Sequence, residues 1–246
     1  MTLVIMQPGY LPWLGFFDLM LRCDTFVVFD DVQYTVRDWR NRNRVKTSTG
    51  ITWLSVPVAR KGVRSKTIRD VRIHNAQPWR QRHLATLQRS YARAPYFDEL
   101  IERLRAAIMG KHKFLIDLDM AIIHCIRDYL GIDTPLLFAS NLHVAGRKDE
   151  RLVAICGLLG ATCYLSPNGA KRYLREPLFE AAGIGVTWQD YEHPYYTQLW
   201  ESQLGFISHL SVVDLLFNHG KDSRGILTAA TRTPAGTAAI RNANDM

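Results

Sequence analysis

The stretch Gln7-Pro8-Gly9-Tyr10-Leu11-Pro12-Trp13-Leu14-Gly15-Phe16-Phe17 joins a short apolar run, Leu3–Met6, to a segment with helical apolar spacing. An apolar run that stops at a Pro-Gly break and leads into a helix is typical of the first strand, turn and helix of an open α/β sheet. Ligands of such sheets bind beyond the carboxyl ends of the strands. This turn therefore predicts the fold class and a first candidate site, with these binding residues: Gln7, Tyr10, Trp13 and Gly15.

Short apolar runs alternate with helical patterns along the rest of the chain. We expect strands at Thr25–Phe29, Thr52–Val58, Ile68–Ile73, Leu136–Ala139, Thr162–Leu165 and Val186–Gln189. We expect helices at Leu14–Cys23, Pro78–Tyr91, Phe97–Met109, Phe114–Leu130, Asp149–Leu159 and Ala170–Ala182. Strand–helix alternation favours an α/β fold with a mainly parallel, Rossmann-like sheet. We predict a single α/β domain over residues 1–227 with a helical insertion at about 76–131, and a disordered tail over 228–246.

Composition and charge narrow the class of protein. No apolar run approaches the roughly 18 residues of a membrane helix, and the N-terminus lacks the basic region of a signal peptide. We therefore expect a cytoplasmic protein without a membrane span. The four cysteines lack CxxC spacing, so neither a metal site nor a disulfide framework is predicted. The net charge of +8, concentrated between Arg37 and Arg82, indicates an anionic partner: nucleic acid, anionic lipid or a phosphorylated small molecule.

The second candidate site is the run Trp39-Arg40-Asn41-Arg42-Asn43-Arg44, which follows the acidic pair Asp30-Asp31. In an extended segment the three arginines would lie on one face. Such a row can hold phosphate or carboxylate oxygens in paired hydrogen bonds. We therefore predict that Asp31, Arg42 and Asn43 bind substrate. The alternative is a solvated edge strand whose charges discourage aggregation.

Two further turns lead into helices and form the third candidate site. Gly146–Arg151 precedes an apolar helix, and Leu165–Ala170 follows a predicted strand and opens the next helix. The free backbone N–H groups of a helix start can bind an anion. The predicted binding residues are Lys148, Asp149, Arg151, Ser166 and Gly169. Ordinary helix capping is the alternative explanation for both turns.

The fourth candidate site is the loop Tyr191–Gln198, in which a proline follows His193. An unperturbed imidazole titrates near neutral pH, so His193 is the first candidate for a general base and His83 the second. Both histidines could instead be structural. Tyr196 and Gln198 are predicted to bind substrate. A single-site hypothesis requires the following residues to line one pocket: Tyr10, Trp13, Arg42, Asn43, Lys148, Ser166 and His193.

Several of these motifs occur in an order that resembles the WbqC-like family. They are QPGYLPWLGFFD (7–18), WRNRN (39–43), His83 with Tyr91, GRKDER (146–151), YLSPNG (164–169), YEHPYYTQ (191–198) and LSVVDLLFNHG (210–220). The resemblance covers Met6 to about Leu227 and implies a transferase-like role in O-antigen, other surface-polysaccharide or specialised-metabolite biosynthesis. The opening turn also resembles the nucleotide-binding turn of HUP-type enzymes. Trp13 and Phe16 stand where the H-x-G-H motif of those enzymes has histidines, which implies a binding role rather than a catalytic one.

These observations favour a biosynthetic transferase that moves an activated acyl or aminoacyl group onto an amine of a sugar or small molecule. No G-x-S-x-G elbow or activated cysteine is present in the sequence, so direct transfer without a covalent enzyme intermediate is expected. The anionic substrate would be linked to phosphopantetheine or a nucleotide, and an acyl carrier protein is a candidate partner. One alternative is a nucleotide-sugar glycosyltransferase with a metal at Asp30-Asp31. The other is a non-catalytic basic module for nucleic acid or other polyanions.

Overall fold

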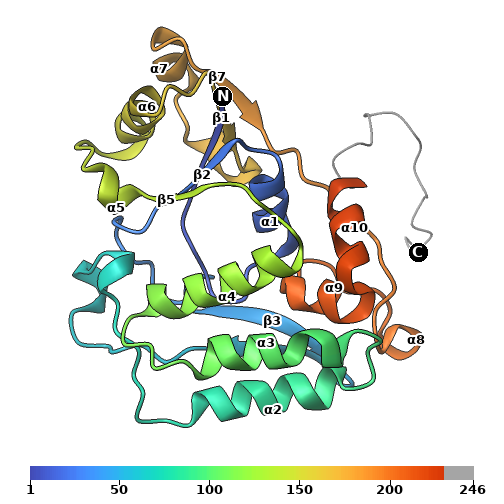
Figure 1. Ribbon diagram of the computed structural model, residues 1–246. Helices are drawn as coiled ribbons and strands as arrows, with labels where there is room; N and C mark the ends of the chain where they lie inside the picture. Colours follow the sequence, from blue (N-terminus) through green and yellow to red (C-terminus); the bar gives the residue numbers. More distant parts are fainter. Residues whose placement is uncertain (230–246) are drawn as a thin grey trace, which may run out of the picture.

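The computed structural model describes residues 1–229. It consists of a parallel sheet, a separate two-stranded hairpin and a layer of helices (Figure 1). In Figure 1 the sheet lies at the top with α6 and α7, whereas α2, α3 and α4 form the lower layer. The predicted tail covers residues 228–246, of which 230–246 lie outside the described residues. Residues 228 and 229 belong to the last described helix, α10, which ends at Ala229, so the predicted start of the tail is wrong at these two positions.

The sheet has five strands in the order β5-β2-β1-β6-β7, and every neighbouring pair is parallel. Its strands are β1 (Thr2–Met6), β2 (Thr25–Val28), β5 (Leu136–Phe138), β6 (Cys163–Ser166) and β7 (Gly185–Trp188). The chain builds β2 and β5 on one side of β1 and then returns to build β6 and β7 on the other. This order confirms the predicted α/β, Rossmann-like sheet, with its change of direction between β1 and β6.

The longer helices pack against this sheet and the hairpin. They are α1 (Leu14–Leu21), α2 (Trp79–Tyr91), α3 (Phe97–Met109), α4 (Leu115–Tyr129), α6 (Lys148–Leu158), α7 (Glu176–Ala181), α9 (Val212–His219) and α10 (Ser223–Ala229). Short turns are α5 (Ala139–Leu142), α8 (Glu201–Leu204), η1 (Val63–Ser65), η2 (Ile68–Asp70), η3 (Asn168–Arg172) and η4 (Gly220–Asp222). Helices α2, α3 and α4 lie where the helical insertion is predicted, while the division into one domain and an insertion stays a prediction.

Two predicted elements are wrong. Ile68–Ile73 was expected as a strand, but its first half forms the 3₁₀ turn η2. Ile68 and Val71 are buried three residues apart, as on one face of a 3₁₀ helix. Val71 and Ile73 are buried two residues apart, as in a strand, but Arg72 and Ile73 form only isolated bridges, to Phe114 and Val58. Ala170–Ala182 was expected as one helix, but it divides into η3 and α7. Pro177 has no N–H to donate to the preceding turn, so a new helix begins there.

The hairpin pairs β3 (Arg42–Thr47) with β4 (Gly50–Ser55) in antiparallel register. Val45 and Leu54 are buried on its inner face. Side chains alternate across a strand, so Arg42, Arg44, Trp53 and Ser55 share the outer face, where Arg42 pairs with Ser55 and Arg44 with Trp53. The hairpin thereby presents a basic and aromatic outer surface.

Both faces of the parallel sheet are buried. Val4 of β1 joins a large apolar core with residues of α1, α2, α3, α4 and α9. Leu3 and Ile5 point the other way and pack with Ile155 of α6 and Phe179 of α7. This arrangement is expected for parallel strands covered by helices on both sides. Within residues 1–229 no helix is both long enough and apolar enough to cross a membrane.

Candidate functional site

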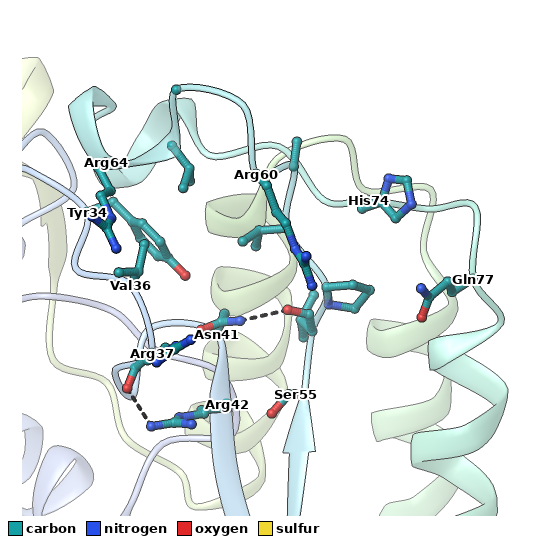
Figure 2. A pocket seen from close by; sticks show the side chains of 16 residues that line it. Tyr34, Val36, Arg37, Asn41, Arg42, Ser55, Arg60, Arg64, His74 and Gln77 are labelled. Atoms are coloured by element: carbon teal, nitrogen blue, oxygen red, sulfur yellow. Dashed lines mark hydrogen bonds between the residues drawn. The ribbon is translucent and has the colours of Figure 1, made fainter.

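A cavity of about 1150 Å³ lies beside the hairpin. One wall comes from the segment that follows β2, between Tyr34 and Arg42, and another from Ser55 to Arg64. His74 and Gln77, just before α2, complete the lining. Figure 2 shows Tyr34, Arg37 and Arg64 on one side of this cavity and Arg60, His74 and Gln77 on the other. A hollow of this size can hold a drug-sized ligand.

The cavity is strongly cationic. Four arginines line it: Arg37, Arg42, Arg60 and Arg64. None of the lining residues is acidic. Within residues 1–229 the side chains of Arg37, Arg60 and Arg64 make no hydrogen bond or ion pair with the protein. Arg42 donates from Nη2 to the carbonyl oxygen of Arg37 and lies 4.5 Å from the centre of the Trp53 ring. Guanidinium groups without counter-charges around one hollow favour a phosphate or carboxylate ligand.

Neutral polar groups accompany these arginines. The Asn41 side chain donates from Nδ2 to the Val56 carbonyl over 2.7 Å, and its buried Oδ1 has no partner. Tyr34 is buried, and burial, together with the charges of Asp119 and Asp38, raises the pKa of its hydroxyl to about 12. The Tyr34 hydroxyl therefore remains protonated at neutral pH.

A fully buried carboxyl group, Asp119 of α4, lies near Tyr34 and Arg40. Neither of its oxygens has a hydrogen-bond partner. Burial raises its pKa well above the ordinary value, and the positive charge of Arg40 opposes that shift only in part. Sequence patterns gave no indication of this acid, because a single aspartate within an apolar helix is not distinctive.

The opening turn packs against the segment that forms one wall of the cavity. Arg40 Nη1 donates to the carbonyl oxygens of Gln7 (3.1 Å) and Pro8 (3.2 Å). The Tyr10 backbone N–H donates to the carbonyl oxygen of Arg40 over 3.1 Å. The turn thus supports the cavity wall, although neither Gln7 nor Tyr10 lines the cavity.

His83, the second candidate base, is buried and is not among the residues that line the cavity. Its Nδ1 lies 2.9 Å from the hydroxyl of Tyr10, and its ring packs 5.3 Å from that of Trp79. Burial lowers the pKa of His83 to about 4, so the ring is neutral at pH 7. Trp79 is itself only 3% exposed, so its ring is not available as a stacking surface for a base.

His193, the first candidate base, lies in an aromatic cluster with Trp13, Tyr191 and His209. The ring centres of Trp13 and Tyr191 are 4.9 Å apart, and those of His193 and His209 are also 4.9 Å apart. Burial and the neighbouring His209 lower the pKa of His193 to about 4. The Trp13 ring occupies the space that a Cβ of Gly15 would fill, which explains the glycine. None of the residues in this cluster lines the cavity.

Tyr196 and Gln198 belong to a buried network around Asp214 of α9. The carboxylate accepts hydrogen bonds from the hydroxyls of Tyr91 (2.7 Å) and Tyr196 (2.9 Å) and from Gln198 Nε2 (2.9 Å). Gln198 Oε1 in turn accepts from Lys46 Nζ over 3.0 Å. This network attaches the loop that carries His193 to α9 and to the hairpin.

The residues predicted at the remaining turns lie at the carboxyl ends of the strands. Asp31 forms an ion pair with Arg151 at 2.5 Å, and its buried Oδ1 has no partner. Asp149 pairs with Arg175 at 3.0 Å. The other three residues predicted at these turns differ in exposure. Lys148 is exposed at the start of α6, Ser166 is buried at the end of β6, and Gly169 is exposed in η3.

The predicted residues therefore occupy several separate places, and the requirement of one shared pocket is not met. The single-site hypothesis placed seven residues in one pocket: Tyr10, Trp13, Arg42, Asn43, Lys148, Ser166 and His193. Of these seven, only Arg42 lines the cavity. The prediction that the arginines lie on one face of an extended segment is correct for Arg42 and Arg44, which share the outer face of β3. It is wrong for Arg40, which precedes the strand and turns toward the opening turn. Asn43 faces inward and donates to the Leu11 carbonyl over 2.6 Å.

Most of the residues that line the cavity could not be identified from the sequence, although the excess of cations in this region is visible there. His74, Gln77, Asn41 and Tyr34 carry no local motif, and the arginines at 60 and 64 come from a segment without a regular period. The one usable signal was the run of cations between Arg37 and Arg82 with few acids. A charge excess of this kind predicts an anion site without identifying its walls.

Comparison with known proteins agrees with the motif order. The sequence model of the WbqC-like protein family matches residues 7–226. The uncharacterized protein Rv1507c of Mycobacterium tuberculosis is 40% identical over 221 residues, which cover 89% of this chain and 94% of that protein. No solved structure shows significant similarity to the chain. On these matches, the chain belongs to the WbqC-like protein family.

Proposed function

We propose that this protein is a biosynthetic transferase that binds an anionic substrate in the arginine-lined cavity. The observation that carries the proposal is the set of three guanidinium groups, Arg37, Arg60 and Arg64, that face one hollow without a counter-charge among residues 1–229. Family membership supports a biosynthetic enzyme in general terms. The group transferred is an activated acyl or aminoacyl group, and the acceptor is an amine of a sugar or small molecule.

The donor is linked to phosphopantetheine or to a nucleotide, because both carry the phosphate that the arginines would bind. Arg60 and Arg64 are exposed at the cavity and would also attract the acidic surface of an acyl carrier protein. The same positive field raises the rate of encounter with an anionic substrate, and it weakens as salt increases.

His74 is the imidazole in the cavity lining, and we assign it the general-base role. The amine nitrogen attacks the acyl carbon, a C–N bond forms, and the C–S or C–O bond to the donor breaks. The imidazole takes the proton of the amine and returns it to the departing thiolate or phosphate. The sequence-based candidates His193 and His83 lie outside the lining, and their lowered pKa values make them weaker bases than an ordinary histidine.

Contacts of the acidic pair make glycosyl transfer the weaker alternative. Asp30 accepts hydrogen bonds from the Ser140 backbone N–H (3.0 Å) and hydroxyl (2.7 Å), and Asp31 pairs with Arg151. Three of their four carboxylate oxygens therefore already have protein partners, and Asp31 Oδ1 has none among residues 1–229. Among residues 1–229, no group of three or more His, Cys, Asp or Glu side chains is arranged to hold a metal ion.

The experiment incubates the purified full chain with a panel of amino-sugar nucleotides and acyl donors, both coenzyme A-linked and carrier-linked. Mass spectrometry then follows the acceptor. We expect a mass gain equal to one acyl group, reduced at least tenfold by His74→Ala and by Arg60→Ala. Arg82→Ala, on the exposed surface of α2, is the matched control and should leave the rate unchanged. No product across the panel, or equal rates for Arg60→Ala and Arg82→Ala, would contradict the proposal.

A further inference from the structure

Two large aromatic side chains are exposed on the outer face of the hairpin. Trp39 is 44% exposed and Trp53 is 43% exposed, although indole rings usually contribute to protein cores. Their ring centres are 5.3 Å apart with an angle of 39° between the planes. The pair therefore forms one continuous aromatic surface that the hydrophobic core does not use.

Guanidinium groups flank this pair. Arg42 lies 4.5 Å from the centre of the Trp53 ring, and Arg44 lies 5.6 Å from Trp39 and 5.9 Å from Trp53. A stack of indole and guanidinium planes can be extended by another flat ring, and its positive charge favours a ligand that also carries anionic groups. A nucleotide combines these two features.

The stack adjoins the cavity. Arg42 belongs to both, since its guanidinium covers Trp53 while its side chain lines the hollow. Ser55, two residues after Trp53 on the same face of β4, also lines the cavity. A base on the tryptophan pair would therefore have its phosphates at the cavity, close to Arg42.

We propose that Trp39 and Trp53 form a stacking surface for the base of a nucleotide whose phosphates occupy the arginine-lined cavity. This inference rests on the proposed function and narrows its substrate to a nucleotide-linked compound. Phosphopantetheine on a carrier protein has no base and would leave the stack unused. The base could belong to coenzyme A or to a nucleotide sugar, and the two sources are separated by the probes below.

The experiment measures the affinity of the full chain for inorganic pyrophosphate, UDP and coenzyme A by calorimetry at one fixed ionic strength. We expect UDP or coenzyme A to bind more tightly than pyrophosphate, and the tighter of the two identifies the source of the base. Stacking on an aromatic ring contributes enough that Trp53→Ala should weaken binding of that nucleotide about 5- to 150-fold. Pyrophosphate affinity should change less than about threefold, because its phosphates contact the arginines.

Two further variants separate stacking from general damage. Trp53→Phe keeps an aromatic ring and should recover most of the affinity for the nucleotide. Tyr173→Ala removes another exposed aromatic side chain, 69% exposed and in a different region, and should have no effect. Circular dichroism of each variant establishes that the fold is retained.

Several outcomes would overturn the inference. One is that UDP and coenzyme A bind no more tightly than pyrophosphate while pyrophosphate itself binds, which leaves the proposed function standing. Another is that Trp53→Ala leaves nucleotide affinity unchanged but abolishes binding to vesicles of phosphatidylcholine and phosphatidylglycerol, which would make the stack a membrane contact. If the wild type binds none of the three probes, the anion cavity and the proposed function fail together with the stacking site.

Discussion

Replacement of Gly9 by alanine tests how the opening turn supports the cavity wall. A Cβ at Gly9 would lie 2.7 Å from the carbonyl oxygen of Trp39, which is closer than real Cβ contacts allow. That carbonyl cannot move freely, because the next residue, Arg40, is held to the turn by hydrogen bonds to Gln7, Pro8 and Tyr10. Gly9→Ala must therefore shift backbone in the segment that carries Trp39 and Arg42.

Overpacking of this kind costs about 1–3 kcal/mol of unfolding free energy. For a chain of this length, that cost corresponds to a fall in melting temperature of about 2–12 °C. Thermal unfolding followed by circular dichroism measures it, and pyrophosphate affinity should fall in the same variant. Gly169→Ala is the control, because no atom lies within 4 Å of a Cβ at that position. Equal melting temperatures for the two variants would show that the close approach of Gly9 to Trp39 does not limit the side chain at this position.

Two further predictions concern buried polar groups. Because the folded state lowers the pKa of His83 from 6.5 to about 4, its stabilising contribution is complete above pH 6.5 and is lost as pH falls toward 4. As pH falls from 6.5 to 4, the free energy of unfolding measured with urea should therefore decrease by about 3 kcal/mol more in the wild type than in His83→Gln. Parallel pH profiles for the two proteins would exclude this assignment. Tyr196→Phe removes the 2.9 Å hydrogen bond to Asp214 and should cost about 1.5–3 kcal/mol. Tyr195→Phe, whose hydroxyl is exposed and donates to Glu201, should cost less than about 0.5 kcal/mol; equal costs would show that the Asp214 network adds nothing.

The sheet could be predicted because parallel strands buried on both faces are continuous apolar runs. Leu3–Met6 and Thr25–Phe29 are such runs, and each matches a strand within one residue. The helix Phe97–Met109 has the predicted bounds because its apolar residues recur every three or four positions. Ile68–Ile73 failed because tertiary packing against α4 replaced strand pairing, which composition cannot reveal.

The candidate site was harder to predict, because its walls come from segments distant in sequence. The two-residue period of β3 correctly placed Arg42 and Arg44 on one face. The approach of Arg60, Arg64 and His74 to Arg42 depends on the path of an irregular segment, which carries no periodic signal. Sequence position also could not show that His83 is buried against Tyr10, since a histidine on a helix can face either the core or the solvent.

Calorimetric titration of the full chain with inorganic pyrophosphate tests directly whether the arginine-lined cavity binds anions. If the arginine-lined cavity is the anion site, the titration should show one binding site whose affinity falls with added salt. In Arg60→Ala the affinity should fall about 10- to 150-fold, because a charge-assisted hydrogen bond is lost. Arg82→Ala carries the same change in net charge outside the cavity and should bind like the wild type. Equal loss of affinity in both variants, or no binding by the wild type, would contradict the claim that the arginine-lined cavity is the anion site.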